Sequence, residues 1–161
     1  MAQNELILPS FEKVIDGETY EIRMLDGVVL HRLYTRLLAC AGAAMQSFGK
    51  IESTGDHTEL AARAIGVLLA SLPQDLHEDA RSLFADNTTV FKADGKKPRL
   101  KNIFGIHFAG RPVHMTKWLI ECFKVNFADF LDENGPLSEM IDRVGKASQS
   151  PKGSTGSPIG S

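Results

Sequence analysis

Cysteine, tryptophan, long apolar runs and an excess of either charge are all scarce in this chain, and each scarcity excludes a class of protein. The two cysteines, Cys40 and Cys122, are far apart and lack metal or redox spacing, so we expect free thiols in a reducing compartment. No apolar run approaches the roughly 20 residues of a membrane-spanning helix. The first residues include acids and have no long apolar core, unlike a signal peptide. The sequence therefore predicts a cytosolic protein with no membrane partner.

Signatures of catalysis and of cofactor binding are missing as well. The chain contains no GxGxxG, GxxxxGK[ST] or GxSxG motif, and its five histidines lack the spacing of a zinc-protease helix. Gly110 and Pro112 separate His107 from His114, so no shared helix presents both imidazoles. These histidines and Cys122 could in principle meet around a metal, but a structural zinc site usually needs four protein ligands. We therefore predict no enzyme, no cofactor and no metal.

The stretch around which the chain is organised runs from Arg111 to Leu131, where Arg111-Pro112 suits the start of a helix. Its apolar residues recur at spacings of three and four, as in an amphipathic helix. They are Met115, Trp118, Leu119, Cys122, Phe123, Val125, Phe127, Phe130 and Leu131. Asn134-Gly135-Pro136 would end the helix. We expect the stripe to form core, with part of it left as a groove for a partner helix.

The N-terminal part predicts a β-hairpin. Two β-prone runs, Phe11 to Ile15 and Thr19 to Met24, flank Asp16-Gly17, a dipeptide typical of tight hairpin turns. Asp26 can cap the helix that follows, which runs to Gly49. An isolated hairpin is marginal in water, so its apolar face must pack on other elements.

The remaining segments alternate between helix and strand. We expect a helix from Asp56 or Thr58 to Leu72, another from Gln74 to Phe84, a strand from Asn87 to Ala93, a helix at Ile103 to Phe108 and a short segment at Leu137 to Val144. This predicts a mainly α-helical α+β fold, with five or six helices packed on a small antiparallel sheet. Residues 1–10 are expected to form a flexible arm, 11–144 a single globular domain and 145–161 a disordered tail or linker.

One basic cluster lies between residues 92 and 101. It comprises Lys92, Lys96, Lys97, Arg99 and Lys101, flanked by Phe91 and Phe104. Lysines for phosphates and aromatic rings for bases are the components of a nucleic-acid site. The formal net charge of the chain is −2, however, so a solvated loop is the simpler interpretation, and nucleic acid is the less favoured partner.

Two segments carry a resemblance to a known family. They are IDGETYEIRML followed by the helix GVVLHRLYTRLLACAGAAM, and FGIHFAGRPVHMTKWLIECFKVNFADFL. In this order they resemble the tail assembly chaperones of long-tailed bacteriophages over roughly residues 11–131. A "HF-x-GR" element maps to His107–Arg111, and an Asn-Phe-x-x-Phe helix end maps to Asn126–Phe130. The basic 92–101 loop and the Ser/Gly/Pro-rich end depart from the family pattern.

The resemblance implies a non-enzymatic role in the host cytoplasm. Members of the family are thought to coat the helical tape measure protein and to deliver it to tail tube subunits. It implies a protein that binds these two partners, can also self-associate, and is not retained in the mature virion. The alternatives are a minor structural or adaptor protein of the tail, and a nucleic-acid-binding module that uses residues 92–101. In relatives, a fraction of translation shifts frame near the end of the chain and makes an extended protein with a second domain. In such a product residues 145–161 would serve as a flexible linker; the alternative is a plain disordered terminus.

The candidate partner-binding residues follow from the helical stripe and its surroundings. They are Trp118, Met115, Lys117, Arg111 and Phe91. Phe123, Phe127 and Phe130 share one face of the predicted helix, whereas Trp118 is rotated from Phe123 by about 140°. We therefore expect the three phenylalanines to be core and Trp118 to be a partly exposed contact.

Overall fold

The computed structural model describes residues 7–48, 57–132, 134–135 and 139. Six helices and three strands occur in this part of the chain. Their order is β1 (Ser10–Ile15), β2 (Glu18–Arg23), α1 (Gly27–Phe48), α2 (His57–Ser71), α3 (Gln74–Asp86), β3 (Thr88–Phe91), α4 (Leu100–His107), α5 (Pro112–Asn126) and α6 (Ala128–Leu131). The predicted α+β fold, mainly helical with a small antiparallel sheet, is confirmed.

The sheet is built on the predicted hairpin. Strands β1 and β2 pair antiparallel from Ser10↔Arg23 to Ile15↔Glu18. Asp16 and Gly17 form the turn with φ values of 48° and 84°, the left-handed conformations that a tight two-residue hairpin turn requires. Strand β3 then pairs antiparallel with β2, which gives the order β1-β2-β3.

One face of the sheet is buried because apolar residues alternate along its strands. Tyr20, Ile22 and Val90 are fully buried on that face, and the register places Tyr20 opposite Val90. Strand β1 forms one edge of the sheet, and its only buried residue is Ile15. The hairpin therefore depends on the helices for burial of its apolar face.

Local signals set the starts of two helices as expected. The backbone N–H of Val28 donates to Asp26 Oδ1 at 2.9 Å, so Asp26 caps α1. Pro73 lies between α2 and α3 and is the N-cap of α3, where its missing N–H costs nothing. The predicted end of the first long helix at Gly49 lies outside the described residues.

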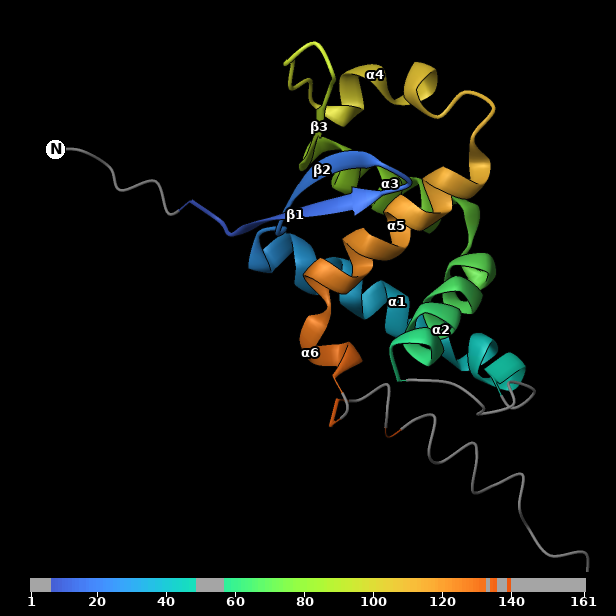
Figure 1. Cartoon of the computed structure of the whole chain (residues 1–161). Coiled ribbons are helices and arrows are strands. Elements are labelled where there is room, and N and C mark those ends of the chain that lie inside the picture. The colour runs from blue at the N-terminus through green and yellow to red at the C-terminus, as the bar shows by residue number, and fades with distance from the viewer. Residues whose placement is uncertain (1–6, 49–56, 133, 136–138, 140–161) are drawn as a thin grey trace, which may run out of the picture.

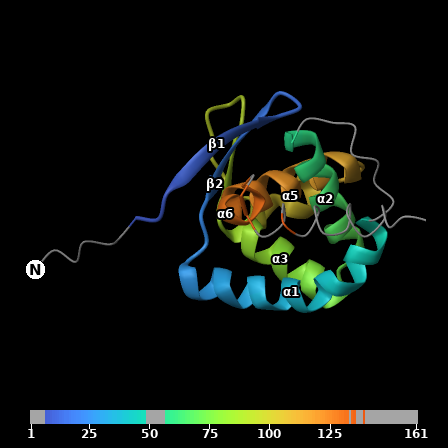
Figure 2. The same ribbon diagram turned by 90° about the horizontal axis from the view of Figure 1, so that it is seen from below.

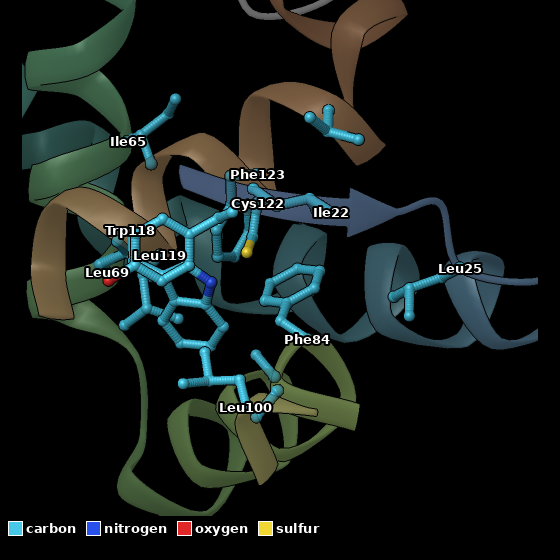
Figure 3. Packing of buried hydrophobic residues seen from close by; sticks show 14 of the residues in the cluster. Ile22, Leu25, Ile65, Leu69, Phe84, Leu100, Trp118, Leu119, Cys122 and Phe123 are labelled. Carbon is cyan, nitrogen blue, oxygen red and sulfur yellow. The ribbon is translucent and has the colours of Figure 1, made fainter. Parts of the chain in front are cut away.

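Helix α5 lies in the middle of the domain, between the sheet and the pair α1 and α2 (Figures 1 and 2). It contacts β1, α2, α3 and α6. Figure 3 shows Trp118, Leu119, Cys122 and Phe123 of α5 packed with side chains of the sheet and of neighbouring helices. The helix with the broad apolar stripe is therefore the centre of the core.

The long helix predicted up to Leu131 is divided in two. Helix α5 ends at Asn126, Phe127 has φ −120° and ψ 33°, and α6 begins at Ala128. The side chain of Asn126 donates to the carbonyl of Cys122 and accepts from the backbone N–H of Leu25. The bond to Leu25, in the segment before α1, fixes the end of α5. The apolar spacing of the sequence continues past this point and therefore does not reveal that the helix ends there.

Several predictions concern residues that the structure does not describe. They are most of the N-terminal arm, the loop at 50–55, the short segment after Pro136 and the terminal segment 145–161. Within the described part, the amide of Met24 donates to the carbonyl of Pro9 at 2.9 Å. The domain thus includes residues at the end of the predicted arm.

Candidate partner-binding site

An apolar groove lies where α1 meets the end of α5 and α6. Its volume is about 380 Å³, within the range of pockets that hold small ligands or a few side chains of a partner. It is lined by Met24, Gly27, Leu30, His31 and Tyr34 on one side, and by Val125, Asn126, Phe127, Ala128, Asp129 and Phe130 on the other. We call it the α1–α6 groove.

The change of direction after Asn126 gives the groove its aromatic wall. It turns α6 so that the ring of Tyr34 lies 5.8 Å from Phe130 and 6.3 Å from Phe127, measured between centroids. Phe127 is buried, whereas Tyr34 and Phe130 are each only half-buried. Two half-buried aromatic residues at an open groove are typical anchors for an apolar partner.

The floor of the groove is held by Asn126, which is buried. Its Oδ1 accepts from the N–H of Leu25 at 2.8 Å, and its Nδ2 donates to the carbonyl of Cys122 at 2.9 Å. Both polar ends of the amide are therefore satisfied, as a buried polar side chain requires. The result is a fixed junction between the segment before α1 and the end of α5.

The expectation that Trp118 is partly exposed is wrong. Its side chain is fully buried and lies against the rings of Phe104 and Phe108, each 5.6 Å away between centroids. The sequence reasoning treated the face opposite Phe123 as free, but α4 covers it. Phe123 and Phe127 are core as expected, and Phe130 packs against the core while only half-buried.

The other predicted contacts lie near the start of α5 or on β3. Lys117 is exposed and donates to Asp16 Oδ1 at 2.7 Å, while Met115 is half-buried against the core. Half-buried Arg111 donates to Glu18 at 2.8 Å. Phe91 is half-buried on β3, with the ammonium group of Lys97 4.2 Å from its ring centroid. These residues do not line the α1–α6 groove.

A second feature is a buried polar cluster centred on Tyr20, whose side chain is fully buried. Its hydroxyl oxygen lies 2.6 Å from His107 Nε2 and 2.6 Å from His114 Nε2. The hydroxyl also donates to Glu18 Oε2 at 3.0 Å. Strand β2 supplies Glu18 and Tyr20, the end of α4 supplies His107, and the first turn of α5 supplies His114. We call these four residues the Tyr20 cluster.

Charged neighbours fix how the cluster is protonated. Lys92 Nζ lies 3.0 Å from His107 Nδ1; an ammonium group only donates, so Nδ1 accepts and Nε2 of His107 carries the proton. Burial, and then the charge of Lys92, lower the pKa of His107. Asp16 Oδ2 lies 3.0 Å from His114 Nδ1, and a carboxylate only accepts, so this nitrogen carries a proton.

The carboxylates of the hairpin stay ionised. Burial alone would raise the pKa of Glu18, but hydrogen bonds from Arg111 and Tyr20 lower it to about 2. The pKa of Asp16 is lowered by hydrogen bonds from Lys117 and His114. Burial, and then Glu18, raise the pKa of Tyr20, so its phenol stays protonated. The hairpin is thus bound to α4 and α5 by charge-assisted hydrogen bonds.

Sequence reasoning did not predict this cluster. It correctly placed His107 and His114 on different helices but paired them with Cys122, which lies elsewhere in the core. The missed signal is the Glu18-x-Tyr20 alternation on β2, directly after the turn residue Asp16. Residues two apart on a strand share a face, so these two polar groups on the inner face of the hairpin required polar partners.

The basic residues between 92 and 101 mostly have partners within the domain. Arg99 and Lys101 both bind Asp86, and Lys96 binds Asp94. Lys92 contacts His107. Two carboxylates, Asp86 and Asp94, thus offset part of the positive charge that a nucleic acid would need, which supports the interpretation of this stretch as a solvated loop.

Comparisons with known proteins identify the family. Residues 16–138 match the family described as phage tail assembly chaperone protein, TAC. No curated protein and no solved structure gave a match. Among the described helices, none is both long and apolar enough to cross a membrane. The family match covers the hairpin turn and β2, the Tyr20 cluster and both sides of the α1–α6 groove. This chain therefore belongs to the family of phage tail assembly chaperones.

Proposed function

We propose that this protein binds the tape measure protein during tail assembly and then yields it to tail tube subunits. Family membership supports a role in assembly, and the α1–α6 groove supports the mode of binding. A long helix with an apolar stripe aggregates unless a partner covers the stripe. An open groove with half-buried aromatic residues fits part of such a stripe by helix-in-groove packing. The role is binding rather than catalysis.

The proposed binding is reversible, and the size of the groove agrees with this. A groove of about 380 Å³ accepts only a few side chains, so each copy would hold a short part of the partner. Small interfaces are characteristic of transient complexes. Several copies along one long helix would then protect it, and each could leave as tube subunits arrive. We propose that this occurs in the host cytoplasm.

Co-expression with the tape measure protein of the same phage tests the proposal. We expect the wild-type protein to raise the soluble fraction of that protein and to co-purify with it. Ala128→Glu should abolish both effects, because Ala128 is exposed in the groove and a charge there opposes apolar contact. Ala70→Glu is the matched control, an exposed alanine on α2 outside the groove. If the wild-type protein neither solubilises nor co-purifies, the proposed function fails.

Two further results would revise parts of the proposal. If Ala128→Glu binds as well as wild type, the groove is not the contact surface. Lys117→Glu then tests the start of α5, where Arg111, Met115 and Lys117 remain proposed contacts, together with Phe91. Mass spectrometry of purified virions tests release: we expect the protein to be absent or strongly depleted, and a stoichiometric amount would indicate a structural component of the tail.

A further inference from the structure

The Tyr20 cluster has the geometry of a metal site. One nitrogen each of His107 and His114 and one carboxylate oxygen of Glu18 lie within 4.8 Å of one another. Glu18 Oε2 is 3.0 Å from His114 Nε2 and 3.6 Å from His107 Nε2. The hydroxyl oxygen of Tyr20 lies 2.6, 2.6 and 3.0 Å from these three atoms.

These separations are close to those of a tetrahedral coordination shell. Zinc binds His nitrogen and carboxylate oxygen at about 2.0–2.2 Å in tetrahedral sites, which places neighbouring ligand atoms about 3.3 Å apart. An outward shift of a few tenths of an ångström would therefore admit an ion. The side chains of His107 and His114 are only 1% and 6% exposed, so they are held in place, while Glu18 at 32% leaves a path from solvent.

The inner atoms of the cluster also converge on one point. The hydroxyl oxygen of Tyr20 lies 2.6 Å from Nε2 of each histidine and 3.0 Å from Glu18 Oε2. Phenol oxygen, imidazole nitrogen and carboxylate oxygen can each supply a lone pair. A cation at the centre would be bound by all four atoms at once.

The neighbouring side chains favour His114 as a metal ligand, whereas Lys92 competes with a metal ion for His107. Asp16 accepts from His114 Nδ1 at 3.0 Å, the arrangement that orients histidine ligands in zinc sites. Arg111 holds the carboxylate of Glu18 from the outside. Lys92, in contrast, donates to His107 Nδ1. Coordination through Nε2 moves the proton of His107 to Nδ1, so the half-exposed Lys92 side chain must swing away.

We propose that Glu18, His107, His114 and Tyr20 bind one divalent transition-metal ion of the zinc type, and that Lys92 opposes its binding. The phenol of Tyr20 coordinates after its proton leaves to solvent, so binding releases protons. The ion joins the hairpin to α4 and α5. This proposal is independent of the proposed function, because the cluster does not line the α1–α6 groove.

Titration of the untagged, chelator-treated protein tests the site. Calorimetry with Zn²⁺ should give one site per chain, and Zn²⁺ should raise the melting temperature of the wild-type protein. Co²⁺ should give the intense visible absorption of four-coordinate cobalt without sulfur charge-transfer bands. If the folded wild-type protein shows neither zinc binding nor this cobalt absorption, the proposal is wrong. Sulfur charge-transfer bands would equally overturn it, since they place the ion at a cysteine.

Two variants outside the coordinating set keep the test independent of folding. Lys92→Met should tighten zinc binding because it removes the competing donor. Asp16→Asn should weaken it about 10–100-fold by changing the partner of His114. His77→Ala, which removes a half-exposed histidine on α3 outside both the cluster and the α1–α6 groove, should leave zinc affinity unchanged. If zinc affinity is the same in the Lys92 and Asp16 variants as in wild type, or falls with His77→Ala, the ion binds elsewhere and the proposal is refuted.

Discussion

Replacing Asn126 should reveal how much stability depends on one buried amide. Asn126→Leu keeps the number and branching of the side-chain heavy atoms but removes the amide oxygen, so the N–H of Leu25 loses its acceptor at 2.8 Å. A buried donor left unsatisfied costs about 1–3 kcal/mol. This is a substantial part of the about 5–15 kcal/mol that stabilises a typical domain. At about 4 °C per kcal/mol for a domain of this size, the melting temperature should fall by about 4–12 °C.

Asn126→Asp gives a second measurement with a different pH dependence. The introduced carboxylate still accepts from the N–H of Leu25. Its other oxygen takes the place of Nδ2, which in the wild-type protein donates to the carbonyl of Cys122 at 2.9 Å. Burial raises the folded-state pKa of this carboxyl above its unfolded value of about 3.9. The variant is therefore closest to wild type below pH 3.9, where a neutral carboxyl donates to Cys122, and loses stability as pH rises through the raised pKa.

Urea unfolding at pH 7 and near pH 4, followed by circular dichroism, measures both effects. Asn102→Leu is the matched control, an exposed asparagine on α4, and should change stability by less than about 0.5 kcal/mol. The reasoning is refuted if Asn126→Leu is as stable as wild type. It is also refuted if the deficit of the aspartate variant is the same at both pH values.

Three further predictions concern other parts of the domain. Trp118→Ala should cost about 3–5 kcal/mol in urea unfolding because the side chain is fully buried; a silent substitution would contradict the packing of α4 on α5. Gly17→Ala should lower the free energy of unfolding by about 1–2 kcal/mol because φ at this position is +84°. Gly27→Ala should not lower it, because Gly27 in α1 has open space where the added methyl group would lie. Lys101 lowers the pKa of Asp86, so this pair stabilises the fold above about pH 3.8 and the effect is lost in acid. In Asp86→Asn the melting temperature should fall less steeply than in wild type as the pH is lowered below about 3.8. An unchanged dependence of melting temperature on pH would show that the pair contributes nothing.

Local signals predicted much of the fold. The Asp16-Gly17 turn, the cap at Asp26 and the break at Pro73 each act through neighbouring residues, so the sequence reveals them. The division of α5 from α6 was not predictable in this way. It depends on a hydrogen bond between Asn126 and Leu25, which are 101 residues apart, and the apolar spacing passes through Phe127 without interruption.

The same distinction explains the site. Periodicity identified the apolar stripe that ends in the α1–α6 groove, but the other wall comes from α1, and no pattern in α5 indicates which helix faces it. Trp118 was misplaced for a related reason. The helical repeat correctly placed Trp118 on a different face of α5 from Phe123. Whether that second face is exposed or buried depends on the position of α4, which the repeat does not predict.

The hairpin at the beginning of the domain is completed by residues from near its end. Tyr20 meets His107 and His114 across 87 and 94 residues, and Leu25 meets Asn126. During translation at roughly 5–20 residues per second, these partners emerge about 5–20 s after the hairpin. A hairpin forms in about 1–10 μs, so it opens and closes many times on the ribosome with its apolar face uncovered. The chain thus passes through a period of synthesis in which the apolar face of its hairpin is exposed to solvent and open to contacts with other chains.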